Sequence, residues 1–323
     1  MVAAGVLPLA HANDAGGSIR VPASCCGLVG LKPTRGRVPT GPGFGDWLHG
    51  YAVELGVTRS VRDTAALLDA VQGPDIGPPN IIAPPARPYL DECTRPPGRL
   101  RIGFTGTPIN GCAIHPHVSD ALANTVGLLE TLGHELVPVA FGTDWQHYFE
   151  QLVVLWSSYV AWSIDGVANA LKRTPSLENL ERVTWELYRH GRSLSATDMQ
   201  NALANFNVVC RQTGAMFEQF DVLLTPTLAQ PPLTLGTLDQ NAIGVDAREW
   251  TRQVFNWVPF TPLYNTTGQP AISLPLQWSP DGLPLGMQFA AKLNDEATLI
   301  RLAAQLESAH PWRARKPGIF YAT

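Results

Sequence analysis

A short run near the start of the chain, Asn13–Ser24, combines residue types that acyl transfer requires. Acyl transfer uses a nucleophile, a base that takes its proton, and hydrogen-bond donors aimed at the developing oxyanion. Ser18 is the candidate nucleophile. The glycines before it have no Cβ, so the backbone can turn sharply and present its N–H groups as a nest of donors. The candidate donors are the backbone amides of Ala15, Gly16, Gly17 and Ser18.

Two oppositely charged residues, Asp14 and Arg20, flank this loop. An ion pair between them would brace the turn. The G-x-S-x-G elbow of α/β-hydrolases is not matched, because Arg20 stands where the last glycine should be. An ordinary polar turn is the alternative interpretation, since glycine and serine occur together in many turns.

No other short motif offers a complete site. His115 and His117 could be metal ligands, but no third ligand follows at suitable spacing, which favours solvated loop histidines. Gly27 and Gly30 lack the spacing and the following helix signal of a phosphate loop. None of the eight histidines is tied to Ser18 by a local motif. The lysines are Lys32, Lys172, Lys292 and Lys316.

Composition bounds the class of protein. The apolar fraction of 45% and the charged fraction of 15% are typical of a globular chain. A net charge of -4 without any Lys/Arg-rich run argues against nucleic-acid binding. No apolar run is long enough to span a bilayer. Five cysteines without a C-x-x-C pair favour reduced, buried thiols and a cytoplasmic location.

The first twelve residues, MVAAGVLPLAHA, imitate the end of a signal peptide. They lack the positive region that such peptides carry, so we prefer a structural role. That role is a buried helix end capped by Gly5, followed by a strand at residues 6–11.

The patterns of apolar and turn residues predict an α/β fold with a mixed sheet in one large domain. Residues 60–63 have the S-x-x-D form of a capping box before an apolar helical face. Strand, helix and strand patterns at 100–104, 116–132 and 135–139 favour parallel pairing. The later predicted elements are a mainly helical region at 145–218 with breaks near Pro175 and Gly191, a strand at 221–226, two strands at 271–275 and 286–290 joined by a turn at 279–282, and a helix at 297–308.

An extended run, Asp14–Arg37, resembles the core of the amidase signature family over its whole length: DAGGSIRVPASCCGLVGLKPTRGR. Further matching runs follow in family order along the chain: Thr58–Asp63, Asp221–Thr227, Asn265–Pro275 and Asp281–Gln288. Within that family the chain is most similar to the 6-aminohexanoate cyclic-dimer hydrolase branch and its general-amidase relatives.

The resemblance implies a mixed β-sheet core flanked by helices. It also implies hydrolysis of linear or cyclic non-peptide carboxamides by a Ser–cis-Ser–Lys triad, with neither a metal nor an organic cofactor. Carried over by position, Ser18 falls on the acylated nucleophile. The amides of Ala15, Gly16, Gly17 and Ser18 fall on the oxyanion hole, and Asp14 and Arg20 on the bracing pair.

The two proton-relay residues that the resemblance implies have no match. In the family both the bridging serine and a buried, neutral lysine precede the nucleophile. Only seventeen residues precede Ser18, and none is a serine or a lysine. Lys32 matches the family's Gly-Leu-Lys-Pro-Thr stretch instead of its catalytic lysine. We therefore expect a chain that lacks the N-terminal third of the fold, from a misplaced start or a truncated frame, with little activity alone.

Residues 140–250 are expected to be a variable, mainly helical part of the domain that forms the substrate pocket. The candidate pocket residues are Trp156, Trp162, Trp185, Tyr188 and Cys210. Core packing is the alternative for the aromatic residues, and a structural thiol for Cys210. The expected partner is a small-molecule amide, without nucleic acid or membrane, and a homodimer stays open. The alternative to an enzyme is a non-catalytic fragment or an amidase-like subunit of a tRNA-dependent amidotransferase.

Overall fold

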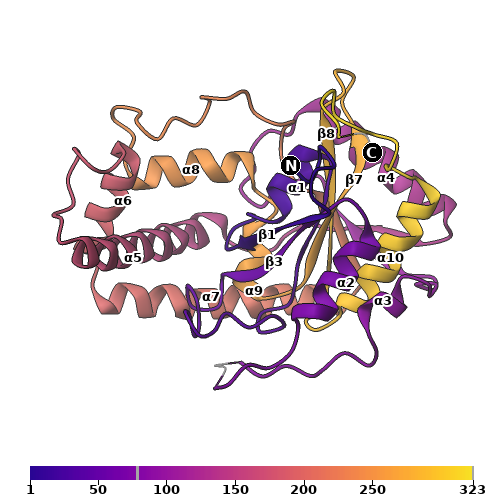
Figure 1. Cartoon of the computed structure of the whole chain (residues 1–323), viewed down its shortest axis with the longest axis horizontal. Helices are drawn as coiled ribbons and strands as arrows, with labels where there is room; N and C mark the ends of the chain where they lie inside the picture. Colours follow the sequence, from indigo (N-terminus) through magenta and orange to yellow (C-terminus); the bar gives the residue numbers. More distant parts are fainter. Residues whose placement is uncertain (78–79, 322–323) are drawn as a thin grey trace. The chain divides into compact units, whose positions relative to one another are not determined.

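The computed structural model describes residues 1–77 and 80–321, which fall into two compact units (Figure 1). The sheet unit comprises Met1–Phe141, Thr213–Pro232 and Val258–Thr323. The helical unit comprises Gly142–Gln212 and Leu233–Trp257. The candidate loop at residues 14–20 belongs to the sheet unit.

The sheet unit is built on an eight-stranded mixed sheet, in the order β1-β3-β2-β7-β8-β6-β4-β5. The neighbouring strands from β1 to β6 are antiparallel, whereas β6, β4 and β5 run parallel. The strands are β1 (Leu9–Asp14), β2 (Val29–Lys32), β3 (Val53–Thr58), β4 (Arg101–Phe104), β5 (Glu135–Pro138), β6 (Val222–Pro226), β7 (Ala271–Trp278) and β8 (Pro284–Ala291).

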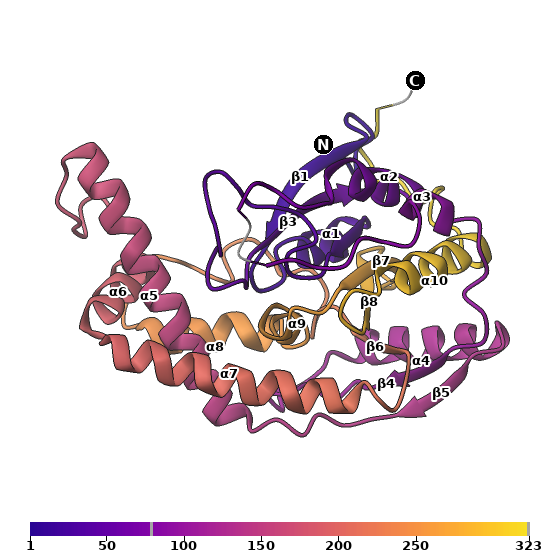
Figure 2. The same cartoon turned by 90° about the horizontal axis from the view of Figure 1, so that it is seen from below.

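Helices of the sheet unit pack against these strands and bury the core. Helix α10 contacts β7 and β8 and lies beside α2 and α3 (Figure 1), while α4 lies along β5 and β6 (Figure 2). Ile272, Phe289 and Leu299 are at most 1% exposed and belong to one apolar cluster. The helices are α1 (Arg20–Cys26), α2 (Val61–Val71), α3 (Tyr89–Glu92), α4 (Pro116–Thr131), α9 (Pro262–Thr267) and α10 (Glu296–Ala309).

The helical unit has its own aromatic core. Tyr148 meets Phe206 edge-on with ring centroids 6.1 Å apart, and Trp145 meets Phe255 at 6.3 Å. Such edge-to-face pairs place the positive ring edge against a negative face. The unit contains α5 (Trp145–Leu171), α6 (Arg182–Ser193), most of α7 (Ala196–Met216) and α8 (Ala247–Trp257).

Several predicted elements are confirmed. The Ser60 hydroxyl accepts a hydrogen bond from the Asp63 N–H at 3.1 Å, so α2 begins with the predicted cap. Strands β4 and β5 pair in parallel around α4, and β7 and β8 form the predicted hairpin. Its turn ends with the Gly282 N–H donating to the Ser279 carbonyl at 2.9 Å.

The predicted cap at Gly5 is confirmed: its φ is 74°, its N–H donates to the Val2 carbonyl, and the Val6 N–H donates to the Met1 carbonyl. The predicted bounds of the first strand are wrong, because it is Leu9–Asp14 instead of 6–11. Pro8 has no N–H for a strand ladder, so pairing starts only after it. The predicted break near Gly191 is confirmed, because α6 ends at Ser193 and α7 begins at Ala196, and Gly191 itself lies in the last turn of α6. A Cβ there would lie 2.0 Å from the Ser157 carbonyl oxygen, so the glycine allows α6 to approach α5 closely.

None of the helices in the described ranges 1–77 and 80–321 combines the length and apolar character needed to cross a membrane.

Candidate active site

The candidate loop connects the end of β1 to the start of α1. Strand β1 is held by β3 along all six residues, with Asp14 opposite Val53. Helix α1 begins at Arg20, so five residues make the connection. Within it Gly17 and Ile19 are buried, whereas the Ser18 side chain is exposed. The fold therefore presents Ser18 to solvent on a connection anchored at both ends.

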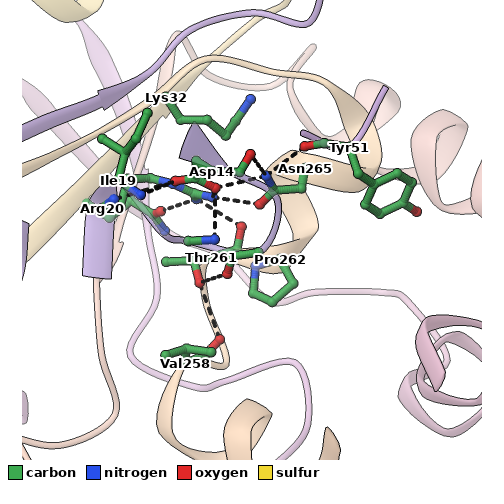
Figure 3. A network of polar contacts seen from close by, with 12 residues as sticks. Asp14, Ile19, Arg20, Lys32, Tyr51, Val258, Thr261, Pro262 and Asn265 are labelled. Atoms are coloured by element: carbon green, nitrogen blue, oxygen red, sulfur yellow. Dashed lines mark hydrogen bonds and ion pairs between the residues drawn. The ribbon is translucent and has the colours of Figure 1, made fainter. Parts of the chain in front are cut away.

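Asp14 organises this connection through both carboxylate oxygens (Figure 3). Its Oδ1 accepts from the Gly17 N–H at 2.8 Å and from Arg20 Nη2 at 2.9 Å. Its Oδ2 accepts from the Ile19 N–H at 3.2 Å and from Arg20 Nε at 2.9 Å. Both side chains are 0% exposed, and the ion pair expected from the flanking charges is present.

The pKa of Asp14 reflects competition between burial and positive neighbours. Burial by itself raises the pKa of this carboxyl group. The charge and hydrogen bonds of Arg20, with a further hydrogen bond from Asn265, outweigh burial and lower the pKa to about 2. Asp14 is therefore ionised at neutral pH.

Arg20 uses all five of its side-chain N–H groups. Two reach Asp14, as given above. Nη1 donates to the Thr261 carbonyl at 2.8 Å and to Gln288 Oε1 at 2.7 Å, and Nη2 donates to Asn265 Oδ1 at 2.7 Å. A buried guanidinium requires such complete satisfaction, because each unpaired donor would carry its full desolvation penalty. Arg20 thus ties the loop to α9 and β8.

Asn265, at the centre of α9, closes the same network. Its Nδ2 approaches the backbone carbonyl and Oδ1 of Asp14, both at 2.9 Å, and the Tyr51 carbonyl at 3.0 Å. The sequence had placed Asn265 and Gln288 in matching runs but gave them no role. Thr261 was not singled out at all.

The four amides predicted as oxyanion donors differ in their hydrogen bonds. The Gly17 N–H donates to Asp14 and points at that carboxylate, so it is not free to bind a substrate. In the part of the chain that the structure describes, the N–H groups of Ala15, Gly16 and Ser18 have no hydrogen-bond partner. These three amides are therefore unbonded, and the oxyanion role of all four stays a prediction.

Lys32, the lysine nearest in sequence to Ser18, is fully buried next to this network. Its Nζ donates to the Pro33 carbonyl at 2.9 Å. Burial lowers its pKa far below the ordinary value, and the positive charge of Arg20 adds to this effect. Among the described residues Lys32 makes no hydrogen bond to Ser18, and it forms no ion pair with a carboxylate.

The predicted pocket residues all lie in the helical unit and not in the sheet unit that carries Ser18. Trp162 is 62% exposed, while Trp156 and Cys210 are half-buried. Trp185 stacks on Tyr188 with ring centroids 5.6 Å apart. Their role in a pocket stays a prediction.

His115 and His117 contact each other edge-on at 4.7 Å, and His115 Nδ1 accepts from the His117 N–H at 3.2 Å. That bond occupies the lone pair that a metal would need at Nδ1. In the described ranges no group of three or more His, Cys, Asp or Glu side chains could hold a metal ion.

Comparison with known proteins identifies the family. The family model described as Amidase matches residues 1–300, so the chain belongs to the amidase family. The chain is 38% identical over 313 residues to the putative amidase AmiC of Mycobacterium leprae, covering 96% of this chain and 64% of that protein. It is 35% identical over 328 residues to the 6-aminohexanoate-cyclic-dimer hydrolase of Paenarthrobacter ureafaciens, covering 98% and 66%.

The fold comparison agrees with the sequence comparison. A solved structure of 6-aminohexanoate cyclic dimer hydrolase superposes with a TM-score of 0.92 at 33% identity, covering 98% of this chain and 68% of that one. The amidase signature fold predicted from the sequence is therefore confirmed. The chain spans 64% to 66% of the length of the relatives named above.

Proposed function

We propose that this chain is an amide hydrolase whose nucleophile is Ser18. The Ser18 Oγ attacks the substrate carbonyl carbon, the C–N bond breaks, and the hydroxyl proton leaves on the amine. Water then attacks the Ser18 ester, releasing the carboxylic acid and restoring the hydroxyl. The observation that carries the proposal is an exposed serine on a loop whose backbone is fixed by the Asp14–Arg20 pair.

The amides of Ala15, Gly16 and Ser18 are the proposed donors to the oxyanion. Donors held rigidly before the reaction stabilise developing charge without reorganisation at the moment of attack. The Gly17 amide has a different role in this proposal, because its bond to Asp14 fixes the loop. This division of roles follows from the hydrogen bonds and revises the four-donor set inferred from the resemblance.

Proton transfer is the part of the reaction to which the residues around Ser18 contribute least. In the described part of the chain the Ser18 hydroxyl makes no hydrogen bond. The serine and lysine that the resemblance implies are absent from residues 1–17. Oxyanion stabilisation and binding without such a relay leave a rate of roughly 10³–10⁴ over water in triad enzymes, and we expect a similar ceiling for residues 1–323 assayed alone.

The proposed substrate is a small linear or cyclic carboxamide. The names of the similar amidases and cyclic-dimer hydrolases support this class. Five free thiols support a reducing, cytoplasmic setting, because persistent disulfides form in oxidising compartments.

The test compares an activated ester with amides. A p-nitrophenyl ester needs no proton on its leaving group, so its turnover isolates the nucleophile and the oxyanion donors. We expect the 323-residue chain to hydrolyse this ester well above the buffer rate and a cyclic diamide more slowly. Ser18→Ala should abolish ester turnover, whereas Ser308→Ala, a change at an exposed serine of α10, should leave it unchanged. Equal rates for the parent chain and Ser18→Ala would refute the proposal.

A further inference from the structure

Two hydrogen bonds fix the peptide unit that joins Gly16 and Gly17. The Thr261 hydroxyl donates to the Gly16 carbonyl at 2.6 Å, and the Gly17 N–H donates to Asp14 Oδ1 at 2.8 Å. The C=O and N–H of one trans peptide point in opposite directions from a rigid plane. Held on both sides, this plane cannot rotate without losing one of the two bonds.

The next peptide unit is fixed by α1. The Gly17 carbonyl accepts from the Val21 N–H at 2.7 Å. The Ser18 N–H belongs to the same plane and points away from that bond, and it has no partner among the residues that the structure describes. Gly17 joins the two planes at a φ of 131°, a conformation that residues with a Cβ rarely adopt. The direction of the Ser18 N–H therefore depends on both the Val21 bond and the plane before it.

Thr261 is well placed to hold that first plane. It is 0% exposed, directly before α9, and its own carbonyl accepts from Arg20 Nη1 at 2.8 Å (Figure 3). Its hydroxyl also packs on Gly17, where an added Cβ would lie only 2.5 Å from Thr261 Oγ1. Thr261 thus touches both glycines of the loop while its backbone is anchored to the Asp14–Arg20 network.

We propose that Thr261 is a positioning residue, whose hydroxyl aligns the Gly16–Gly17 peptide so that the Ser18 amide and hydroxyl face the reacting carbonyl together. This inference rests on the proposed function of Ser18. Thr261 does not itself contact the substrate. Without its hydroxyl, the Gly16 carbonyl loses the hydrogen bond from Thr261 and the plane gains freedom to rotate. The direction of the Ser18 N–H is then held only by the bonds that Gly17 makes to Asp14 and Val21.

The test uses two kinds of substitution. Thr261→Val keeps the size of the side chain and removes the hydroxyl, whereas Thr261→Ser keeps the hydroxyl. The kcat and KM of p-nitrophenyl ester hydrolysis, the melting temperature, and amide hydrogen exchange at Gly17 are measured for each. We expect Val to lower kcat by about 10-fold to 100-fold with little change in KM, since small misplacements of reacting groups have effects of that size. Exchange at Gly17 should become faster, and Ser should restore both values.

The outcomes separate this inference from the function on which it rests. If Thr261→Val destabilises the fold, Thr261→Ala serves as a second variant without the hydroxyl. Unchanged kcat in a folded hydroxyl-free variant, with Ser18-dependent turnover intact, overturns the role of Thr261 alone. A change confined to KM also overturns it, because that indicates ground-state binding. Absence of Ser18-dependent turnover in the parent chain overturns the proposed function, and the role of Thr261 with it.

Discussion

Replacing Arg20 with lysine tests whether the buried network is held by hydrogen bonds or by charge. Arg20→Lys keeps the positive charge beside Asp14 but reduces five N–H donors to three. At least two of the five buried hydrogen bonds are then lost, and each charge-assisted bond or acceptor left unsatisfied costs about 1–3 kcal/mol. The expected loss in the free energy of unfolding is therefore about 2–6 kcal/mol, a large part of the stability of an ordinary domain.

Urea unfolding at neutral pH, monitored by circular dichroism and tryptophan fluorescence, measures this loss. The control is Arg252→Lys, because Arg252 is 54% exposed and pairs with the partly exposed Glu249. An exposed pair contributes about 0–1 kcal/mol, so the control should unfold close to the parent chain. If Arg20→Lys also unfolds within about 1 kcal/mol of the parent, the hydrogen-bond reasoning is refuted.

The other predictions concern pH dependence and close packing. Folding lowers the pKa of Asp14 from 3.8 to about 2. Ionised Asp14 therefore adds about 2 kcal/mol to the free energy of unfolding above pH 3.8, and this contribution is lost as the pH falls through about 2. Urea midpoints measured from pH 5 to pH 2 should show that loss, and Asp14→Asn should have a flatter profile. Lys32 has a lowered folded pKa, so the unfolded chain binds more protons and stability rises with pH towards 10.5. Lys32→Met should remove that rise. If the variant and the parent chain show the same slope of stability against pH between pH 7 and 10, Lys32 is not held neutral. Gly191→Ala should lower the melting temperature, because the new Cβ would meet the Ser157 carbonyl oxygen at 2.0 Å. Gly127→Ala in α4, where nothing lies within 4 Å of the added Cβ, should be neutral or stabilising by up to about 1 kcal/mol.

The local part of the site could be predicted from the sequence. Asp14 and Arg20 lie six positions apart, so their opposite charges could be assigned to one turn before any contact was known. The capping box at Ser60 and the parallel pair of β4 and β5 could likewise be predicted from short-range patterns. In each case both partners belong to one segment or to one β-α-β unit.

The distant part of the site could not be predicted in this way. Thr261 meets Gly16 across 245 positions, and Gln288 meets Arg20 across 268. Periodicity and spacing do not say which distant segments converge on a loop. The resemblance marked the segments of Asn265 and Gln288, but only the structure showed that their side chains complete the five bonds of Arg20.

Glycine positions were ambiguous for a related reason. The sequence predicted a helix break near Gly191, and α6 ends two residues later, at Ser193. In the structure the missing side chain of Gly191 provides the room for α6 to pack on α5. Gly17 was assigned as an oxyanion donor, yet its amide bonds Asp14 and its φ of 131° shapes the turn.

The most direct test of Ser18 as the nucleophile is covalent trapping followed by peptide mass analysis. Trypsin releases residues 1–20 as one peptide, because Arg20 is the first Lys or Arg in the chain, and Ser18 is its only serine. After reaction with a sulfonyl fluoride, we predict the sulfonyl adduct on Ser18 in fragment spectra of that peptide, and no adduct in Ser18→Ala. An unmodified peptide, or an adduct that persists in Ser18→Ala, would contradict the account.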